Sequence, residues 1–268
     1  LIVVSDSFFS LRNKLALDVI KYSKINYQIN FKNKSYNKKK YNGFFDNIIN
    51  EIKIDLNYKK NVFYTFGKKF KLNFNLKDLK KYKKYNKIIL IGMGGSALAS
   101  EAIFHFLKSK IKKEFIFIKN LDKREIDFHF KNKKFKNALF LLISKSGNTI
   151  ETLSIIENLK EANLNKNNSL VITEKKRSQL SEYAKANNIN IIYHRKFIGG
   201  RYSVFSETGI VPALLMGLDE KKFKKHTLEF LKKNNKTLKK NVLKLSQVYS
   251  SKKINSLILL NYCPELEF

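Results

Sequence analysis

The feature that most constrains the fold is an alternation of short, unbroken apolar runs with helical patterns after Tyr85. The runs predict strands at Lys87–Met93, Glu114–Lys119, Ala138–Ser144, Ser169–Thr173 and Asn190–Tyr193. Between them, helices are predicted at Ala97–Ser109, Asn148–Glu161 and Arg177–Asn187. Strands that are apolar along their whole length must be covered on both faces of the sheet. The pattern therefore predicts an α/β fold with a doubly wound parallel sheet.

The chain divides by composition into three parts. Residues 1–84 read as an N-terminal extension, mostly helical and loop, and residues 85–218 as the α/β domain. Residues 219–268 read as a helical connection that leads into a further apolar strand. Before the α/β domain we expect a helix at Phe8–Ile25 and another at Phe44–Ile52, which is followed by loops or short strands. After it we expect one or two basic helices within Glu220–Ser251 and a strand at Ser256–Leu260.

Charge is the least ordinary property of the composition. Fifty-four Lys and Arg against 22 Asp and Glu give a formal net charge of +32, which alone would suggest a nucleic-acid ligand. The lysines are spread through the whole chain together with Asn, Ile, Phe and Tyr, the residues that A+T-rich codons supply. We therefore interpret the charge as a solvated surface and expect no specific nucleic-acid partner.

Cysteine content and hydropathy bound the cellular setting. Cys263 is the only cysteine, so the sequence has no intrachain disulfide and no multi-cysteine metal site, as is usual in a reducing cytosol. The longest apolar runs, such as Ala138 to Ile143, are far shorter than the roughly 18 residues that span a bilayer. We expect a soluble, cytoplasmic protein that has no membrane partner.

The first of three informative strand-to-helix loops is Gly92 to Ser96. Ligands of open parallel sheets bind at the carboxyl ends of the strands, and the free N–H groups of a helix start can bind an anion there. The loop also fits the dinucleotide pattern G-x-G-x-x-A. That pattern needs an acidic residue after the next strand, where this chain has Lys119-Asn120, so we favour an anion.

The second loop, Ser144 to Thr149, reads Ser-Lys-Ser-Gly-Asn-Thr. Its hydroxyls, lysine and glycine offer side-chain and backbone donors to one phosphate at a helix start. A simple helix cap, which Asn148 with Glu151 could form, needs fewer polar residues. The loop predicts a phosphate site, and the missing Gly-x4-Gly-Lys-Ser/Thr pattern argues against hydrolysis of nucleoside triphosphates.

The third loop contains Gly199-Gly200-Arg201-Tyr202-Ser203 and leads into a helix predicted at Ser206–Leu218, with Ser206 as its cap. An arginine is always charged and offers a planar fork of donors, which suits a carboxylate or a developing enediolate oxygen.

In order and spacing, the three loops resemble those of the phosphoglucose isomerase family, and Gly-Gly-Arg-Tyr-Ser is the most distinctive match. The resemblance covers roughly Lys87 to Phe268 and implies a sugar isomerase (SIS) fold. The family has two such domains with the active site between them. The resemblance therefore identifies this chain as an N-terminal fragment that holds the first domain and the opening of the second.

The resemblance also implies roles for single residues. Arg201 would stabilise the enediolate near C1 and C2, and Glu151 would orient the histidine that opens the sugar ring. Asn148 stands where many members carry a hydroxyl. The sugar phosphate would be held by Gly95, Ser96, Ser144, Lys145 (partly through its backbone), Ser146 and Thr149.

The family's glutamate base, ring-opening histidine and C-terminal lysine have no match before Phe268, so we expect residues 1–268 alone to be inactive. Four histidines do not match that histidine and are expected to be surface or hydrogen-bonded residues: His105, His129, His194 and His226. They are dispersed, and no metal site is expected.

By resemblance, the intact protein is an aldose–ketose isomerase of glycolysis and gluconeogenesis, a homodimer that needs no cofactor. It would interconvert glucose 6-phosphate and fructose 6-phosphate through a cis-enediol. One alternative is a bifunctional phosphoglucose/phosphomannose isomerase. Another is a non-catalytic regulator that binds phosphosugars through a single sugar isomerase domain. Such a regulator would need a DNA-binding helix-turn-helix before that domain, and Asn26–Lys84 shows no convincing one.

Overall fold

The computed structural model describes residues 38–130, 137–159, 162–219, 222 and 235–250. The strands are β1 (Lys87–Ile91), β2 (Glu114–Ile118), β3 (Ala138–Ile143), β4 (Ser169–Glu174) and β5 (Asn190–His194). The α-helices are α1 (Lys38–Asp55), α2 (Gly95–Phe106), α3 (Lys123–Phe130), α4 (Ile150–Glu157), α5 (Gln179–Ala186), α6 (Glu207–Leu215) and α8 (Asn235–Ser250). Short 3₁₀ helices are η3 (Val62–Phe66), η4 (Leu76–Tyr82), η5 (Lys108–Lys110) and η7 (Gly200–Tyr202).

The five strands form one parallel sheet in the order β2-β1-β3-β4-β5. β1 and β3 are neighbours although β2 lies between them in the sequence, and Ile91 pairs with Leu142. After β1 the chain winds toward one edge of the sheet, and after β3 it winds toward the other. Ligands of such sheets bind where the winding reverses. That point lies between the carboxyl ends of β1 and β3.

Both faces of the sheet are buried. Ile88 and Leu90 of β1 pack into one apolar layer, whereas Ile89 and Ile91 pack into the other, because successive strand side chains point to opposite faces. Every residue of β3 is buried. This explains why the strands lack polar alternation, and the predicted doubly wound parallel sheet is confirmed.

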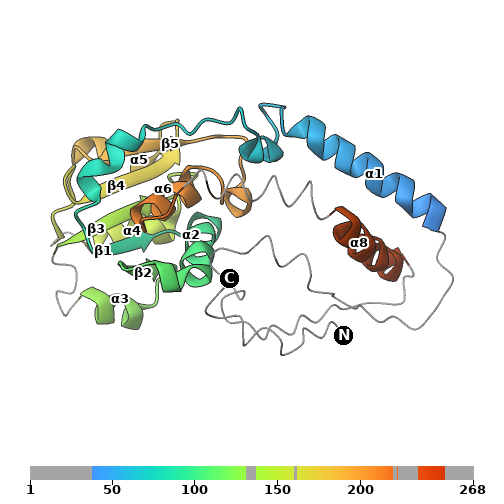
Figure 1. Cartoon of the computed structure of the whole chain (residues 1–268). Helices are drawn as coiled ribbons and strands as arrows, with labels where there is room; N and C mark the ends of the chain where they lie inside the picture. Colours follow the sequence, from blue (N-terminus) through green and yellow to red (C-terminus); the bar gives the residue numbers. More distant parts are fainter. Residues whose placement is uncertain (1–37, 131–136, 160–161, 220–221, 223–234, 251–268) are drawn as a thin grey trace.

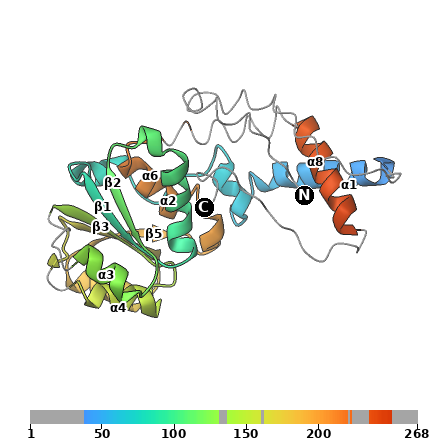
Figure 2. The same ribbon diagram turned by 90° about the horizontal axis from the view of Figure 1, so that it is seen from below.

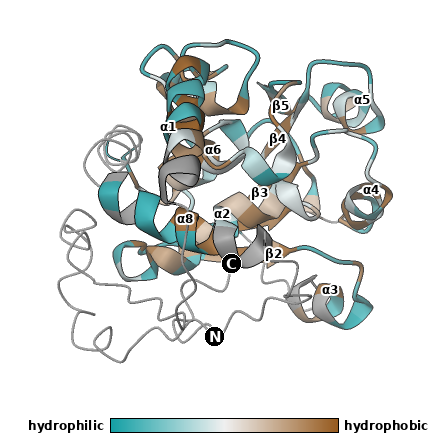
Figure 3. Cartoon of the chain, turned by 90° about the vertical axis from the view of Figure 1, so that its right-hand side faces the viewer, coloured by the Kyte–Doolittle hydropathy of each residue, from teal (hydrophilic) through white to brown (hydrophobic). Residues whose placement is uncertain are grey.

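Helices α2 and α6 cover one face of the sheet, and α3, α4 and α5 cover the other (Figures 1 and 2). α2 and α6 are linked by Ser100 Oγ, which donates to the carbonyl of Thr208 at 2.8 Å. In Figure 3 the central strand β3 is coloured as hydrophobic, whereas hydrophilic and hydrophobic residues alternate along the outer helices α4 and α5.

The segment between α1 and β1 packs onto the sheet. Leu79 and Tyr82 of η4 are buried in the same layer as α2 and α6. The Tyr82 hydroxyl donates to the carbonyl of Ser169 at 3.1 Å and accepts from Asn190 Nδ2 at 3.2 Å. Burial raises the pKa of Tyr82 to about 12. The tyrosine therefore ties this segment to the first residues of β4 and β5.

α1 and α8 lie side by side, away from the sheet (Figures 1 and 2). Lys239 Nζ of α8 is 2.7 Å from both carboxylate oxygens of Asp46 in α1. Across the described ranges, every helix is too short or too polar to cross a membrane. The predicted helix Phe8–Ile25 and strand Ser256–Leu260 lie outside these ranges.

The predicted strands match the observed ones to within two residues at each end. Of the loops or short strands expected after α1, the structure has loops, together with the 3₁₀ helices η3 and η4, and no strand in the segment between α1 and β1. The helix near Phe44–Ile52 is longer than predicted and spans Lys38–Asp55. α3 was not predicted; it is only eight residues long, and Ile126 packs it against the sheet.

Candidate functional site

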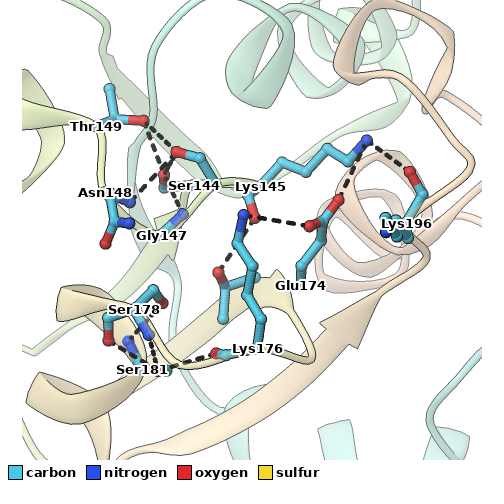
Figure 4. A network of polar contacts seen from close by, with 12 residues as sticks. Ser144, Lys145, Gly147, Asn148, Thr149, Glu174, Lys176, Ser178, Ser181 and Lys196 are labelled. Atoms are coloured by element: carbon cyan, nitrogen blue, oxygen red, sulfur yellow. Dashed lines mark hydrogen bonds and ion pairs between the residues drawn. The ribbon is translucent and has the colours of Figure 1, made fainter.

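Three hydroxyls of the Ser144–Thr149 loop converge at the carboxyl end of β3 (Figure 4). Ser144 Oγ lies 2.9 Å from Thr149 Oγ1 and 3.4 Å from Ser146 Oγ. Ser146 Oγ lies 3.2 Å from Thr149 Oγ1. Hydroxyl protons rotate to suit their partner. The three groups, which we call the hydroxyl cluster, can therefore donate together to one anion.

The backbone turns tightly around the hydroxyl cluster. Gly147 has a φ of 69°, and a Cβ at this position would overlap Ser178 Oγ, so the turn requires glycine. The N–H groups of Gly147 and Asn148 donate to Ser144 Oγ at 3.1 Å and Ser146 Oγ at 3.2 Å. These bonds hold the two serine side chains on the same side of the loop.

The side chain of Lys145 points away from the hydroxyl cluster (Figure 4). Its Nζ donates to the carbonyl of Lys196 at 2.9 Å and lies 3.3 Å from Glu174 Oε1. The lysine thereby links the loop that follows β3 to the last residue of β4 and to the loop that follows β5. In this position the side chain of Lys145 does not reach the hydroxyl cluster, so only its backbone groups could contact a ligand there.

Asn148 does not form the simple helix cap that the sequence would also have allowed. Thr149 occupies the N-cap position of α4, and its side chain makes no capping hydrogen bond. Asn148 Oδ1 instead accepts from the N–H of Gln179 at 3.0 Å, at the start of α5. The Thr149 hydroxyl therefore belongs to the hydroxyl cluster, beside the N-terminus of α4, where the helix dipole favours an anion.

The loop after β1 meets the Gly199–Arg201 loop at the N-terminus of α2. A Cβ on Gly95 would lie 2.6 Å from the carbonyl carbon of Gly200 and 2.8 Å from the nitrogen of Arg201. Only a glycine allows two backbones to approach so closely. Ser96, half-buried, follows in the first turn of α2. The structure therefore joins two of the three predicted loops by direct contact.

Arg201 and Glu151 expose their side chains. The guanidinium of Arg201, in η7, pairs with no residue that the structure describes, and the same holds for the carboxylate of Glu151 in the first turn of α4. A guanidinium that has no partner among the described residues is available to an anionic ligand.

The end of β2 argues against the dinucleotide alternative. Lys119 Nζ contacts both carboxylate oxygens of Glu101, at 2.7 and 3.0 Å. Glu101 is buried in α2. A dinucleotide-binding strand carries an acidic residue here for the ribose hydroxyls, whereas this chain presents a lysine bound to a buried glutamate.

A pocket of about 800 Å³ opens beside these loops, at the carboxyl ends of β4 and β5. Its lining residues are Asn73, Glu174, Lys175, Lys176, Tyr193, His194, Arg195, Lys196 and Phe197. No residue expected to hold the sugar phosphate lines it, and Ser146 of the hydroxyl cluster is exposed on the open surface. Within the described ranges, no group of three or more His, Cys, Asp or Glu residues could hold a metal ion.

The sequence reasoning did not connect His194 with the third loop. This last residue of β5 is 3% exposed, and its Nε2 lies 3.2 Å from Ser206 Oγ. Burial, helped by the charge of Lys145, lowers the pKa of His194 to about 4. Ser206 precedes α6 as expected, but it makes no capping hydrogen bond. A histidine at a strand end just before the Gly-Gly-Arg segment is the sequence signal that could have indicated this pairing.

The fold and these loops define a doubly wound α/β protein whose candidate ligand site lies at the switch point between β1 and β3. A solved structure of a hypothetical protein from Thermus thermophilus shares the fold. Its TM-score is 0.58 and its sequence identity 19%, over 72% of this chain and 49% of that one.

The family model described as phosphoglucose isomerase matches residues 68–243. The chain therefore belongs to the phosphoglucose isomerase family. The glucose-6-phosphate isomerase of Methanocaldococcus jannaschii is 32% identical over 149 residues, which are 54% of this chain and 36% of that protein. That of Acholeplasma laidlawii is 33% identical over 217 residues, 73% of this chain and 49% of that protein. The chain thus spans about a third to a half of the length of these relatives.

These findings confirm the expected family and fold. The match begins at residue 68, earlier than the resemblance noted from Lys87. It includes η4, which packs onto the sheet.

Proposed function

We propose that the complete natural protein carrying this chain is an aldose–ketose isomerase that interconverts glucose 6-phosphate and fructose 6-phosphate. The observation that carries the proposal is the phosphoglucose isomerase match over residues 68–243, a range that contains the hydroxyl cluster and Arg201. The relatives from Methanocaldococcus jannaschii and Acholeplasma laidlawii are named glucose-6-phosphate isomerases.

In this proposal the phosphate of the sugar binds between the N-termini of α2 and α4. Ser144, Ser146 and Thr149 donate from the hydroxyl cluster, and Gly95 and Ser96 contribute from the start of α2. Lys145 takes part through its backbone. The two helix dipoles favour the dianion, and hydroxyl donors orient it.

Arg201 stabilises the negative charge that develops on the substrate when a proton leaves C2. The cis-enediol forms, and a proton returns to C1, so the substrate is both oxidised and reduced and no cofactor is consumed. A positioned guanidinium stabilises such charge without having to reorganise. Glu151 orients the ring-opening histidine. We assign no proton-transferring base among the described residues.

We further propose that residues 85–218 are the first of two sugar isomerase domains, preceded by the extension 1–84 and followed by the connection 219–268. The enzyme acts in the cytoplasm as a homodimer. Its mass in solution, measured by light scattering, tests the dimer.

The reaction is tested by following the sugars by NMR in D₂O with the complete natural protein. An isomerase of this class interconverts the two sugar phosphates and introduces deuterium at the carbon that receives the proton. A protein that does neither would contradict the proposal. Mannose 6-phosphate, offered in parallel, measures selectivity at C2.

A further inference from the structure

A chain of buried hydrogen bonds connects the end of β5 to the loop that carries Arg201. It runs from His194 through Ser206 and Ser203 to the carbonyl of Gly200. Ser203 and Ser206 have no exposed surface, and His194 is 3% exposed. Buried polar groups persist in proteins when they are hydrogen-bonded. Here His194 Nε2 contacts the Ser206 hydroxyl, and the two serine hydroxyls each bond to a backbone carbonyl three residues earlier in the chain.

The direction of each bond follows from the available protons. Ser203 Oγ donates to the carbonyl of Gly200 at 2.6 Å, and Ser206 Oγ donates to the carbonyl of Ser203 at 2.9 Å. With the Ser206 proton on the carbonyl of Ser203, the tautomer of His194 that carries its proton on Nε2 completes the contact of 3.2 Å as its donor.

The surroundings of the ring keep it neutral. Burial lowers the pKa of His194 to about 4, and the positive charges of Lys145 and Arg195 also lower it, whereas a backbone hydrogen bond at Arg195 and the charge of Glu174 oppose the shift. At neutral pH the ring therefore carries one proton, which the bond to Ser206 places on Nε2.

The chain ends at the turn that sets the position of Arg201. The N–H of Ser203 also donates to the carbonyl of Gly200, at 3.3 Å. On its other side, Gly200 rests against Gly95 of α2. The backbone of the turn is thus held between α2 and the buried chain, whereas the guanidinium of Arg201 has no partner among the described residues. Among the described residues, the position of the Arg201 side chain therefore depends on the position of the turn.

We propose that His194 is a positioning residue that, through Ser206 and Ser203, holds the η7 turn and thereby aims Arg201 at the substrate. The inference rests on the proposed function, in which Arg201 acts on the developing enediolate. Misplacing a charge stabiliser lowers the rate of the chemical step, while the contacts to the remote phosphate persist. His194 should therefore control kcat rather than KM.

Two substitutions in the complete natural protein separate this role from simple packing. His194→Leu fills most of the space but donates nothing, whereas His194→Gln keeps an N–H donor near the place of Nε2. We expect His194→Leu to lower kcat about tenfold, the effect of one ordinary hydrogen bond, with KM nearly unchanged. His194→Gln should recover most of that loss. His105→Gln, on α2 and outside the buried chain, is the control and should leave kcat unchanged.

A double-mutant cycle with Arg201→Lys shows whether the effect passes through Arg201. If it does, His194→Leu lowers kcat much less in the Arg201→Lys background than in the parent. Equal losses in both backgrounds would overturn the inference. So would a parent-like kcat for His194→Leu, or an effect on KM alone.

Failure of the proposed function has a different signature, because the parent protein then fails to interconvert the sugars. In that case amide hydrogen exchange of residues 200–203 gives the answer. Faster exchange in His194→Leu than in the parent and His194→Gln, with β3 unchanged, supports the positioning role, and equal rates overturn it. If His194→Leu does not fold, Ser206→Ala interrupts the same chain and is measured in its place.

Discussion

Gly95 and Gly200 are in direct backbone contact, so close that a Cβ on Gly95 would lie 2.6 Å from the carbonyl carbon of Gly200. The first turn of α2 and the turn that carries Arg201 therefore form one structural unit, although they are far apart in the sequence. A change at Gly95 should displace Arg201 without altering any group of the arginine itself.

Gly95→Ala tests this contact. The new methyl group must push backbone against backbone, and overpacking of this kind costs about 1 to 3 kcal/mol of unfolding free energy. Chemical denaturation measures the loss. Gly43→Ala is the matched control: it lies within α1, where a Cβ meets nothing within 4 Å, so it should stabilise the protein by about 0.5 to 1 kcal/mol. Equal effects of the two substitutions would contradict the contact.

Arg201→Lys should lower kcat much more than it changes KM. Lysine keeps the charge but loses the planar fork, so the stabilisation of the enediolate falls and kcat drops about 100-fold. Steady-state kinetics of the complete natural protein measure the change. Arg124→Lys, at an arginine of α3 paired with Asp122, should behave like the parent. An unchanged kcat in Arg201→Lys would assign that arginine a structural role.

Ser144→Ala combined with Thr149→Ala should raise KM and weaken inhibition by inorganic phosphate. Each lost bond to a dianion is worth roughly 1.5 to 3 kcal/mol, or about tenfold or more in affinity. The loop itself should survive, because the N–H of Gly147 also donates to the carbonyl of Ser144 at 3.2 Å. Ser154→Ala, on α4 away from the hydroxyl cluster, is the control. Unchanged affinity for fructose 6-phosphate in the double variant would place the phosphate elsewhere.

Tyr82→Phe should reduce stability at neutral pH by about 1 to 2 kcal/mol, because the buried carbonyl of Ser169 and the side-chain amide of Asn190 lose their bond to the phenol. It should also change how steeply the free energy of unfolding falls with pH above pH 10. The folded pKa of about 12 lies above the ordinary value of 10.0, so the neutral phenol stabilises the fold fully below pH 10. That contribution disappears as the pH rises toward 12.

Urea denaturation at pH 9, 10, 11 and 12 measures the difference between the parent and Tyr82→Phe. Lysine titration is common to both proteins and cancels in the comparison. The parent should lose on the order of 2 kcal/mol more than the variant over this range. Parallel curves would contradict the burial of Tyr82.

The sheet could be predicted because its signal is local. An apolar run such as Ala138–Ile143 is buried on both faces, and that burial is visible in the residues themselves. η4 gave no such signal, because its Leu79 and Tyr82 are held by packing on the finished sheet. Packing can impose structure where local propensity is weak.

The candidate site was predictable in its loops but not in their connections. Ser144 and Thr149 could be assigned together because they share one short loop. The bonds from Lys145 to Glu174 and from Asn148 to Gln179 depend on β4 lying beside β3. The strand order that creates this neighbourhood is a property of the whole chain, so no single stretch of sequence indicates these pairs.

The anchoring of Tyr82 also bears on how the protein is made. Its hydroxyl bonds to Ser169 and Asn190, which follow it by 87 and 108 residues. A ribosome releases the chain from its N-terminus, so Tyr82 emerges long before the two strands that bury it. Until β5 has left the ribosome, the aromatic ring and the neighbouring Leu79 stay exposed to water and to other chains. The nascent protein therefore completes its core late. It can aggregate through these exposed side chains for as long as the ribosome takes to synthesise β1 to β5.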